Sequence, residues 1–347
     1  QYYSYHKKGE VYSTEEDYDR AIDNFTMAAY YKPSPLYQFY IGYCYYKLKN
    51  YPLAIKYCEN SLKSSINEII LVHSAQHIEI FDTLYNKISI KEKFPVVYQI
   101  LGDAYFILSD YNNAITYYDS ALLINPKSYE AYYFKASSYF ELGQFVEAID
   151  NYNHVLALKG RTKNEDDLLF KAHLYNNLAY CYNKTGQYLE SLSYYDTLIL
   201  IDKKNSDNYF ERANNFFELK NYGLALLDYD KALSIDNQPQ YLLGKANCLY
   251  ALKRFKQAAQ ILEKIIYTVK VKKTETPNPL NSNIMDTVTF AYKPFFTVEN
   301  LTKIANAYYE LKKYELANNY FDSLLKQTVP DWSNINFTNI LNKKIQC

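Results

Sequence analysis

The sequence predicts an all-α protein built from a repeated pair of helices, and three observations support this. Glycine and proline, which break helices, number only 8 and 10 in 347 residues. Hydrophobic residues make up 48% of the chain, which is enough to bury a core. Small residues recur at a fixed interval, since Gly9 and Gly42 are 33 residues apart and Gly102 and Ala136 are 34 apart. A period in this range is the signature of a stacked-repeat architecture.

The repeating unit is best preserved over residues 95–128. When Pro95 is counted as position 1, Gly102 stands at position 8, a second small residue follows at position 20, and aromatic residues are common at positions 11, 17 and 24. Residues three and four apart share a helix face, so each unit is expected to be two helices that cross at the small residues. One such hairpin cannot bury its faces alone, so the copies should stack. Position 8 holds Gly9, Gly42, Gly102, Ala136, Ala179, Ala213, Ala246 and Ala305.

This unit resembles the tetratricopeptide repeat. The copy at residues 95–128 carries the family's residues in the family's order, namely Leu101, Gly102, Tyr105, Ala114, Tyr118, Ala121 and Pro126. The resemblance implies a right-handed superhelical solenoid of about eight repeats that forms a single domain over residues 1–347. Ser191 departs from the pattern at position 20, where the other copies have alanine. The repeats lie near residues 2–34, 35–65, 95–128, 129–162, 172–205, 206–238, 239–271 and 298–329.

Four segments fall outside the repeats. Residues 66–94 keep a helical apolar period, so we expect either an extra helix or a long extension of the preceding helix. A polar loop is expected near residues 161–167, leading into an extended helix, and a true loop over residues 272–297, which contain two prolines near their start. Residues 333–345 are expected to form a helix that caps the last repeat.

In this family the first helix of each pair lines a concave groove, and the resemblance therefore places a binding surface at positions 2, 5, 9, 12 and 13. These positions are rich in aromatic residues, which are favoured at binding surfaces. Position 9 is asparagine in three consecutive repeats, and a row of amides could pair with an extended peptide backbone. The alternative is that asparagine and tyrosine are common throughout this chain, which has 42 tyrosines, and that the row is chance. The candidate partner-binding residues are Tyr43, Tyr46, Asp103, Phe106, Tyr133, Asn176, Tyr180, Phe210, Asn214, Phe217, Asn247, Tyr250, Asn306 and Tyr309.

Motifs that carry catalysis are missing from the sequence. It contains no glycine-rich phosphate loop, no nucleophile elbow and no catalytic Cys/His arrangement. His73 and His77 are four residues apart, but no further ligand set with metal spacing accompanies them. We therefore expect no catalytic residue, no metal and no cofactor. Four cysteines at interior positions are expected to act as small hydrophobic side chains: Cys44, Cys58, Cys181 and Cys248.

The expected function is that of a non-catalytic scaffold or adaptor for protein–protein interaction, which holds a peptide or helix along its concave groove. Two alternatives stay open. The chain could be a structural subunit of a large assembly, such as a motor, cilium or secretion apparatus, bound through its convex face and insertions. It could also be the recognition arm of a larger enzyme whose catalytic domain is not in this sequence.

The expected partner is a protein or peptide. Acidic and basic residues balance at 38 each, which argues against bulk capture of nucleic acid or anionic membrane. No run of about 18 apolar residues predicts a membrane span. The family's carboxylate clamp for chaperone tails needs lysine, asparagine and arginine at set positions of three consecutive repeats, which no three repeats here supply. The cysteine pattern favours the cytoplasm, while a periplasmic or exported location after signal removal stays open.

Overall fold

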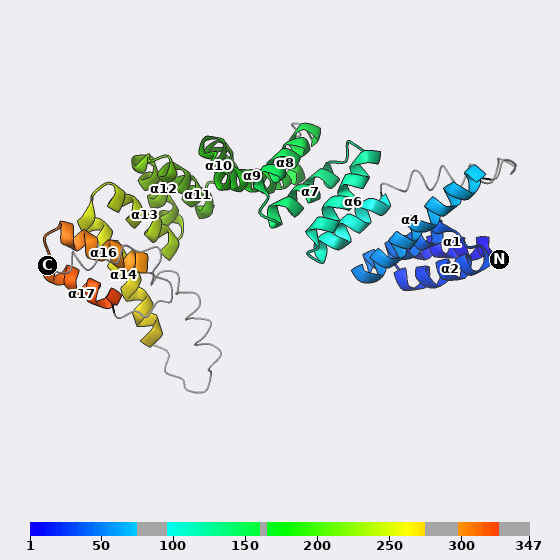
Figure 1. Cartoon of the computed structure of the whole chain (residues 1–347), viewed down its shortest axis with the longest axis horizontal. Helices are drawn as coiled ribbons and strands as arrows, with labels where there is room; N and C mark the ends of the chain where they lie inside the picture. The colour runs from blue at the N-terminus through cyan, green and yellow to red at the C-terminus, as the bar shows by residue number, and fades with distance from the viewer. Residues whose placement is uncertain (75–95, 160–164, 275–297, 326–347) are drawn as a thin grey trace. The chain divides into compact units, whose positions relative to one another are not determined.

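The computed structural model describes residues 1–74, 96–159, 165–274 and 298–325. Every regular element within these ranges is an α-helix, and successive helices pack against each other as pairs, which confirms the all-α repeat prediction (Figure 1). The chain divides into two compact units, Gln1–Leu174 and Tyr175–Cys347, which we call unit 1 and unit 2. The single domain and the handedness of the superhelix stay predictions.

Unit 1 holds the first helix pairs. They are α1 (Tyr2–Thr14) with α2 (Tyr18–Tyr31), α3 (Pro35–Lys47) with α4 (Tyr51–Ser74), the helix over residues 96–107 with α6 (Tyr111–Ile124), and α7 (Tyr129–Glu141) with α8 (Phe145–Lys159). Helix α9 (Glu165–Lys184) begins in unit 1 and ends in unit 2.

Unit 2 continues the same pattern. Its helices are α10 (Tyr188–Ile201), α11 (Ser206–Glu218) with α12 (Tyr222–Ile235), α13 (Pro239–Ala251) with α14 (Phe255–Thr274), and α16 (Val298–Glu310) with α17 (Tyr314–Leu325). Helices α11 and α12 pack on each other as a pair, and α12 packs on α13, so the core runs from one repeat into the next.

The turn inside each repeat is built the same way in every copy. The residue at position 15 has a positive φ, which ends the first helix; it is a glycine only at Gly143 and Gly186. The next residue caps the second helix where its side chain is a suitable acceptor, as when Asp110 accepts a hydrogen bond from the backbone N–H of Asn113. The other position-15 residues are Glu16, Lys49, Ser109, Lys220, Lys253 and Lys312.

The helices cross at the small residues, as predicted. Ala114 at position 20 is fully buried, and a Cβ added to Gly102 would lie 2.5 Å from Cε1 of Tyr118. Because Tyr118 is itself fully buried, any larger residue at position 102 would force the ring out of the core. The small residue therefore sets the distance between the two helices of the repeat.

Ser191, which departs from the pattern, belongs to a buried polar chain. Its hydroxyl donates to the carbonyl oxygen of Ala179 at 2.7 Å and accepts from Nδ2 of Asn215 at 2.9 Å. Asn215 is fully buried, and its Oδ1 accepts from Nδ2 of Asn183 at 2.7 Å. The extra hydroxyl is thus matched by partners, as buried polar groups must be.

The four repeat cysteines are free and buried, which confirms their prediction as interior side chains. Burial raises the pKa of the Cys44 and Cys248 thiols to about 11 and that of Cys58 and Cys181 to about 12. These thiols therefore stay protonated near neutral pH and behave as apolar groups.

The structure changes the boundaries of three expected segments. Helix α4 continues to Ser74, so the start of the expected insertion is an extension of the preceding helix. Helix α9 already begins at Glu165, so the acidic run 165–167, expected to be loop, forms a helix N-terminus, where negative charge is favourable. Helix α14 continues to Thr274, three residues into the expected loop. The expected capping helix 333–345 lies outside the described residues, as does His77.

Candidate functional site

The candidate site is the side of the first helices that carries positions 2, 5, 9, 12 and 13, which we call the first-helix face. In unit 1, Tyr46 of α3 donates to Oδ2 of Asp103 on the next first helix at 3.1 Å. In unit 2, Nζ of Lys303 on α16 donates to Oδ1 of Asn247 on α13 at 2.9 Å. Neighbouring first helices therefore share a continuous polar and aromatic surface within each unit.

The predicted site residues lie on this face with one common trait, partial exposure. Asn176 and Tyr180 are exposed, and the other twelve are half-buried. Side chains that are neither sealed in the core nor fully solvated can meet a partner while held in place. Whether this face forms one concave groove that binds a partner stays a prediction.

The aromatic residues at position 12 have a packing role that the sequence did not reveal. Phe217 meets Tyr222, which opens the second helix of the same repeat, with ring centroids 5.4 Å apart. Tyr250 meets Phe255 in the same way at 5.3 Å. These rings support the turn between helices, so they offer only part of their surface to a ligand. Three other predicted residues pack in this manner: Tyr46 on Tyr51, Phe106 on Tyr111 and Tyr309 on Tyr314.

The first-helix face of unit 1 contains a hollow of about 420 Å³. Its walls come from α1, α2, α3 and the start of the helix over residues 96–107, and they include the predicted residue Tyr43. The lining is mainly aromatic and aliphatic with a polar rim, as in sites that accept an apolar group. The lining residues are Glu10, Ser13, Thr14, Phe25, Phe39, Tyr40, Tyr43 and Val96.

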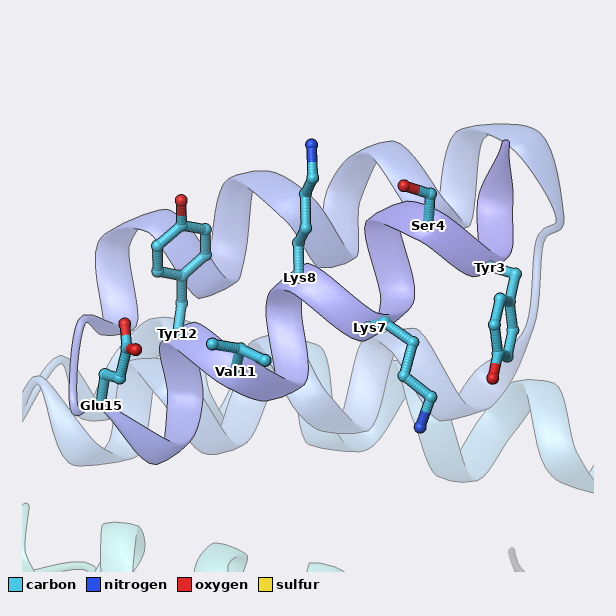
Figure 2. Close-up of a pocket in the computed structure, with 7 residues that line it drawn as sticks. All are labelled: Tyr3, Ser4, Lys7, Lys8, Val11, Tyr12 and Glu15. Carbon is cyan, nitrogen blue, oxygen red and sulfur yellow. The ribbon is translucent and has the colours of Figure 1, made fainter.

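A second hollow, of about 670 Å³, lies along α1 (Figure 2). Six of the seven lining side chains belong to α1, and the seventh is Glu15, directly after the helix. Figure 2 shows Lys8 and Tyr12 on one side of the helix and Tyr3 and Lys7 on the other. A surface formed by a single helix has no opposing wall. It is therefore a weaker candidate for a site than the smaller hollow beside Tyr43.

Asp103 is the most strongly held polar residue on the face of unit 1. Its Oδ1 accepts from the hydroxyl of Tyr118 at 2.8 Å and from Nε2 of Gln99 at 2.9 Å, while its Oδ2 accepts from Tyr46. Burial raises the pKa of this carboxyl, and the three hydrogen bonds partly oppose that rise. Asp103 thus presents a fixed acceptor to the face.

The asparagines of unit 2 are also oriented by the chain itself. Oδ1 of Asn214 accepts from the hydroxyl of Tyr229 at 2.7 Å, and its Nδ2 donates to Oε2 of Glu211 at 3.2 Å. Oδ1 of Asn247 accepts from Lys303. The acceptor ends of both amides are therefore engaged, which makes the Nδ2 donors the groups that can meet a ligand.

A cluster of three charged side chains links α11 to its neighbouring helices in unit 2. Arg212 donates through Nε and Nη2 to the two carboxylate oxygens of Asp228, both at 2.7 Å, and through Nη1 to Asp196 at 2.7 Å. The Asp228 hydrogen bonds, with those to Asp196, raise the pKa of Arg212. A bidentate pair of this kind fixes α11 between α10 and α12.

Sequence reasoning assigned the position-24 tyrosines to packing alone and missed their hydroxyls. Tyr118, Tyr152 and Tyr229 each hydrogen-bond the polar residue at position 9 of their own repeat. A signal was present, because position 9 is Asp, Ser or Asn in these repeats, while Leu262 and Phe321 stand at position 24 where no such pair forms.

Two glutamates that the sequence did not single out join neighbouring repeats. Oε1 of Glu59 accepts from the hydroxyls of Tyr105 and Tyr117, at 2.9 and 3.0 Å, and these two rings stack 5.4 Å apart. Glu263 receives the same pair of bonds from Tyr308 and Tyr320, at 2.7 and 2.8 Å. Contacts between repeats therefore account for part of the high tyrosine content of the chain.

In the described part of the chain, no cluster of three or more His, Cys, Asp or Glu side chains could hold a metal ion. No helix in that part is long and apolar enough to cross a membrane.

Curated relatives are distant and longer than this chain. A TPR repeat-containing protein of Methanocaldococcus jannaschii is 24% identical over 339 residues, which cover 93% of this chain and 55% of that protein. The human DnaJ homolog subfamily C member 7 is 25% identical over 178 residues, or 48% of this chain and 34% of that protein. The chain therefore spans about half and about a third of these relatives.

Among solved structures, the C-terminal part of a TPR repeat-containing protein from Cytophaga hutchinsonii aligns with a TM-score of 0.48 at 16% identity, over 86% of this chain and 98% of that one. Sequence profiles described as tetratricopeptide repeat match residues 6–68, 96–128, 127–199, 210–269 and 299–331. These matches span most of the sequence and coincide with the helix pairs, and the chain belongs to the tetratricopeptide-repeat family.

Proposed function

We propose that this chain is a non-catalytic scaffold that binds an extended polypeptide segment along its first-helix face. The observation that carries the proposal is the orientation of the unit 2 amides. Tyr229 and Lys303 engage the carbonyl ends of Asn214 and Asn247. The donors along the face are then Nδ2 of Asn247 and the second N–H of Asn214, whose first N–H is donated to Glu211. Backbone carbonyl oxygens of an extended segment are the acceptors that such a row suits, whatever the ligand's side chains.

The hollow beside Tyr43 gives unit 1 a different part in this function. Its walls of Phe39, Tyr40 and Val96 suit an apolar side chain of the bound segment, because burying such a group gains roughly 1.5–3 kcal/mol. The rim carries Glu10 and two hydroxyls, so a basic or neutral residue beside the apolar anchor fits better than an acidic one. We therefore assign backbone recognition to unit 2 and side-chain recognition to unit 1.

We expect no carboxylate clamp of the kind that chaperone adaptors use, although one relative is named as a DnaJ homolog. The lysines, asparagines and arginine that such a clamp needs occur at the required positions of no three consecutive repeats. A selected peptide should therefore bind equally well with a free or an amidated C-terminus.

The test uses a library of random dodecapeptides displayed on phage and selected on the full chain. Synthetic copies of the selected peptides are then measured by fluorescence anisotropy. Changing Asn214, Asn247 and Asn306 together to alanine should weaken binding by at least tenfold, since each amide hydrogen bond contributes about 1 kcal/mol.

The matched control changes Gln257 and Gln260, two exposed amides on the second helix α14, to alanine. This control should bind as the parent chain does. Equal affinity of the triple variant and the parent would contradict the proposal.

One observation favours docking into an assembly as a second function. Position 29, near the C-terminal end of the second helices, carries large apolar side chains in three repeats: Tyr30, Leu123 and Leu200, exposed by 77%, 85% and 74%. Each of these side chains is exposed enough to contact a partner protein. If the triple asparagine variant keeps its affinity for the selected peptides while Leu123→Lys and Leu200→Lys lose theirs, docking into an assembly through the second helices replaces peptide binding on the first-helix face as the proposed function.

A further inference from the structure

Three repeats place a buried tyrosine hydroxyl beneath position 9 of the first-helix face. Tyr118 reaches Asp103 at 2.8 Å in unit 1, and Tyr229 reaches Asn214 at 2.7 Å in unit 2. Tyr152 lies 3.1 Å from the hydroxyl of Ser137. The three tyrosines are exposed by 2% or less, so each ring serves the core while its hydroxyl ends at the face.

The tyrosine is the donor to Asp103 and to Asn214. A carboxylate can only accept, so Tyr118 donates to Asp103. Between Tyr152 and Ser137 either hydroxyl can donate, and Ser137 also reaches the carbonyl oxygen of Tyr133 at 3.0 Å. Nδ2 of Asn214 is directed to Glu211, which leaves Oδ1 to accept from Tyr229. Burial raises the pKa of Tyr118 and Tyr229, so these donors keep their protons at neutral pH.

Room for the Tyr229 ring comes from the next repeat. A Cβ added to Gly244 on α13 would lie 2.7 Å from Cζ of Tyr229 and 3.0 Å from its hydroxyl oxygen. The ring tip is therefore pressed between α11 and the bare backbone of α13. Because neither side can yield without opening the core, the hydroxyl has one position, and so does the amide that it holds.

We propose that Tyr229 is a positioning residue for the ligand-binding amide of Asn214, and that Tyr118 and Tyr152 position Asp103 and Ser137 in the same way. The hydroxyl holds Oδ1 of Asn214, and Glu211 accepts from one N–H of Nδ2, so the second N–H is oriented as a donor before any ligand arrives. Binding then loses less side-chain freedom, which strengthens it without a direct contact between tyrosine and ligand. This inference rests on the proposed function for its ligand and on the structure alone for the orientation.

The test is a double-mutant cycle on the full chain with a dodecapeptide selected from the displayed library. Tyr229→Phe keeps the buried ring and removes only the hydroxyl, and it should weaken binding about fivefold, the loss of one hydrogen bond. Asn214→Ala should weaken binding by the same amount or more. The variant with both changes should bind no more weakly than Asn214→Ala alone, because the tyrosine acts only through the amide.

Tyr195→Phe is the matched control. Tyr195 occupies the same position 24 and is equally buried, but position 9 of its repeat is Tyr180. This control should leave the affinity unchanged. An equal loss from Tyr229→Phe in the parent and in the Asn214→Ala chain would overturn the inference, because the tyrosine would then act through the fold in general.

A second readout needs no ligand. In the full chain labelled with ¹⁵N at asparagine side chains, the amide pair of Asn214 is the signal that Asn214→Ala removes. Tyr229→Phe should shift that pair, and Tyr195→Phe should not. If Tyr229→Phe leaves the signal in place, the positioning role is overturned, whatever the peptides do. If the signal moves but no selected peptide depends on Asn214, the peptide-binding function is overturned and Tyr229 positions a side chain without a ligand.

Discussion

The first-helix faces of the two units carry different chemistry on the same helical framework. Unit 1 presents an aromatic hollow around Phe39 and Tyr43, whereas unit 2 presents the amides of Asn214 and Asn247. The positions that hold the helices together, 8, 20 and 24, stay small or aromatic in both units apart from Leu262 at position 24. The framework therefore leaves the first-helix face of each unit free to vary.

The largest expected difference between the units lies in their ion pairs. Arg212→Met in unit 2 should cost about 3 kcal/mol, because it leaves the buried Asp228, exposed by only 6%, without its partner. Lys135→Met in unit 1 removes the pair with Asp119, whose side chain is 51% exposed, and should cost only about 0.5 kcal/mol. Urea unfolding followed by circular dichroism measures both. Equal losses would contradict the distinction.

The buried amide of unit 2 provides the next test. At position 10 the repeat of α11 has Asn215, whereas the repeat of α3 in unit 1 has Cys44. Asn215→Cys should cost about 2 kcal/mol, because Nδ2 of Asn183 loses its buried acceptor. Adding Ser191→Ala gives this place in unit 2 the Cys–Ala pairing found at Cys44 and Ala21 in unit 1 and at Cys248 and Ala225 in unit 2. The double variant should recover part of the loss in thermal unfolding, and simple additivity of the two changes would contradict the buried chain.

Position 9 can be made alike in the two units by Asp103→Asn. Burial raises the pKa of the Asp103 carboxyl above its ordinary value of 3.8, so folding favours the protonated form. The stability contribution of Asp103 is therefore present at low pH and is lost as the pH rises through the raised pKa. We expect the unfolding free energy of the variant, relative to the parent, to improve from about pH 4 towards neutrality. A difference that is flat with pH would contradict this.

The smallest expected effect is at the turns. Gly143 in unit 1 and Lys220 in unit 2 share the left-handed conformation at position 15, with φ of 72° and 60°. Gly143→Ala should destabilise by about 1 kcal/mol through backbone strain, since a Cβ there would meet nothing within 4 Å. Lys220→Gly should stabilise by about 0.5 kcal/mol because glycine adopts this φ freely. Thermal midpoints that move in the same direction would contradict the shared turn geometry.

The helix pairs could be predicted because small residues and aromatics repeat with one period, and that period fixes which residues cross. The role of Tyr229 could not be predicted from the sequence, because phenylalanine and tyrosine fill the packed position 24 equally well. Only the structure shows which group the hydroxyl contacts. The start of α9 was mistaken for loop because its first residues are acidic, although acidic side chains are favourable at a helix N-terminus. The Ser191 departure could not be interpreted within its own repeat, because its partner Asn215 lies in the next repeat, 24 residues further along the chain.

The two glutamates that join repeats have a consequence for how the chain may be cut or extended. Glu59 is bound by tyrosines 46 and 58 residues further along the sequence, and Glu263 by tyrosines 45 and 57 residues further. Doubling the length of a connecting segment costs only about 0.6 kcal/mol, less than one such hydrogen bond to a charged group contributes. We therefore expect the segment between each glutamate and its tyrosines to tolerate an inserted domain or a single cut in the polypeptide, because the hydrogen bonds still join the repeats on either side.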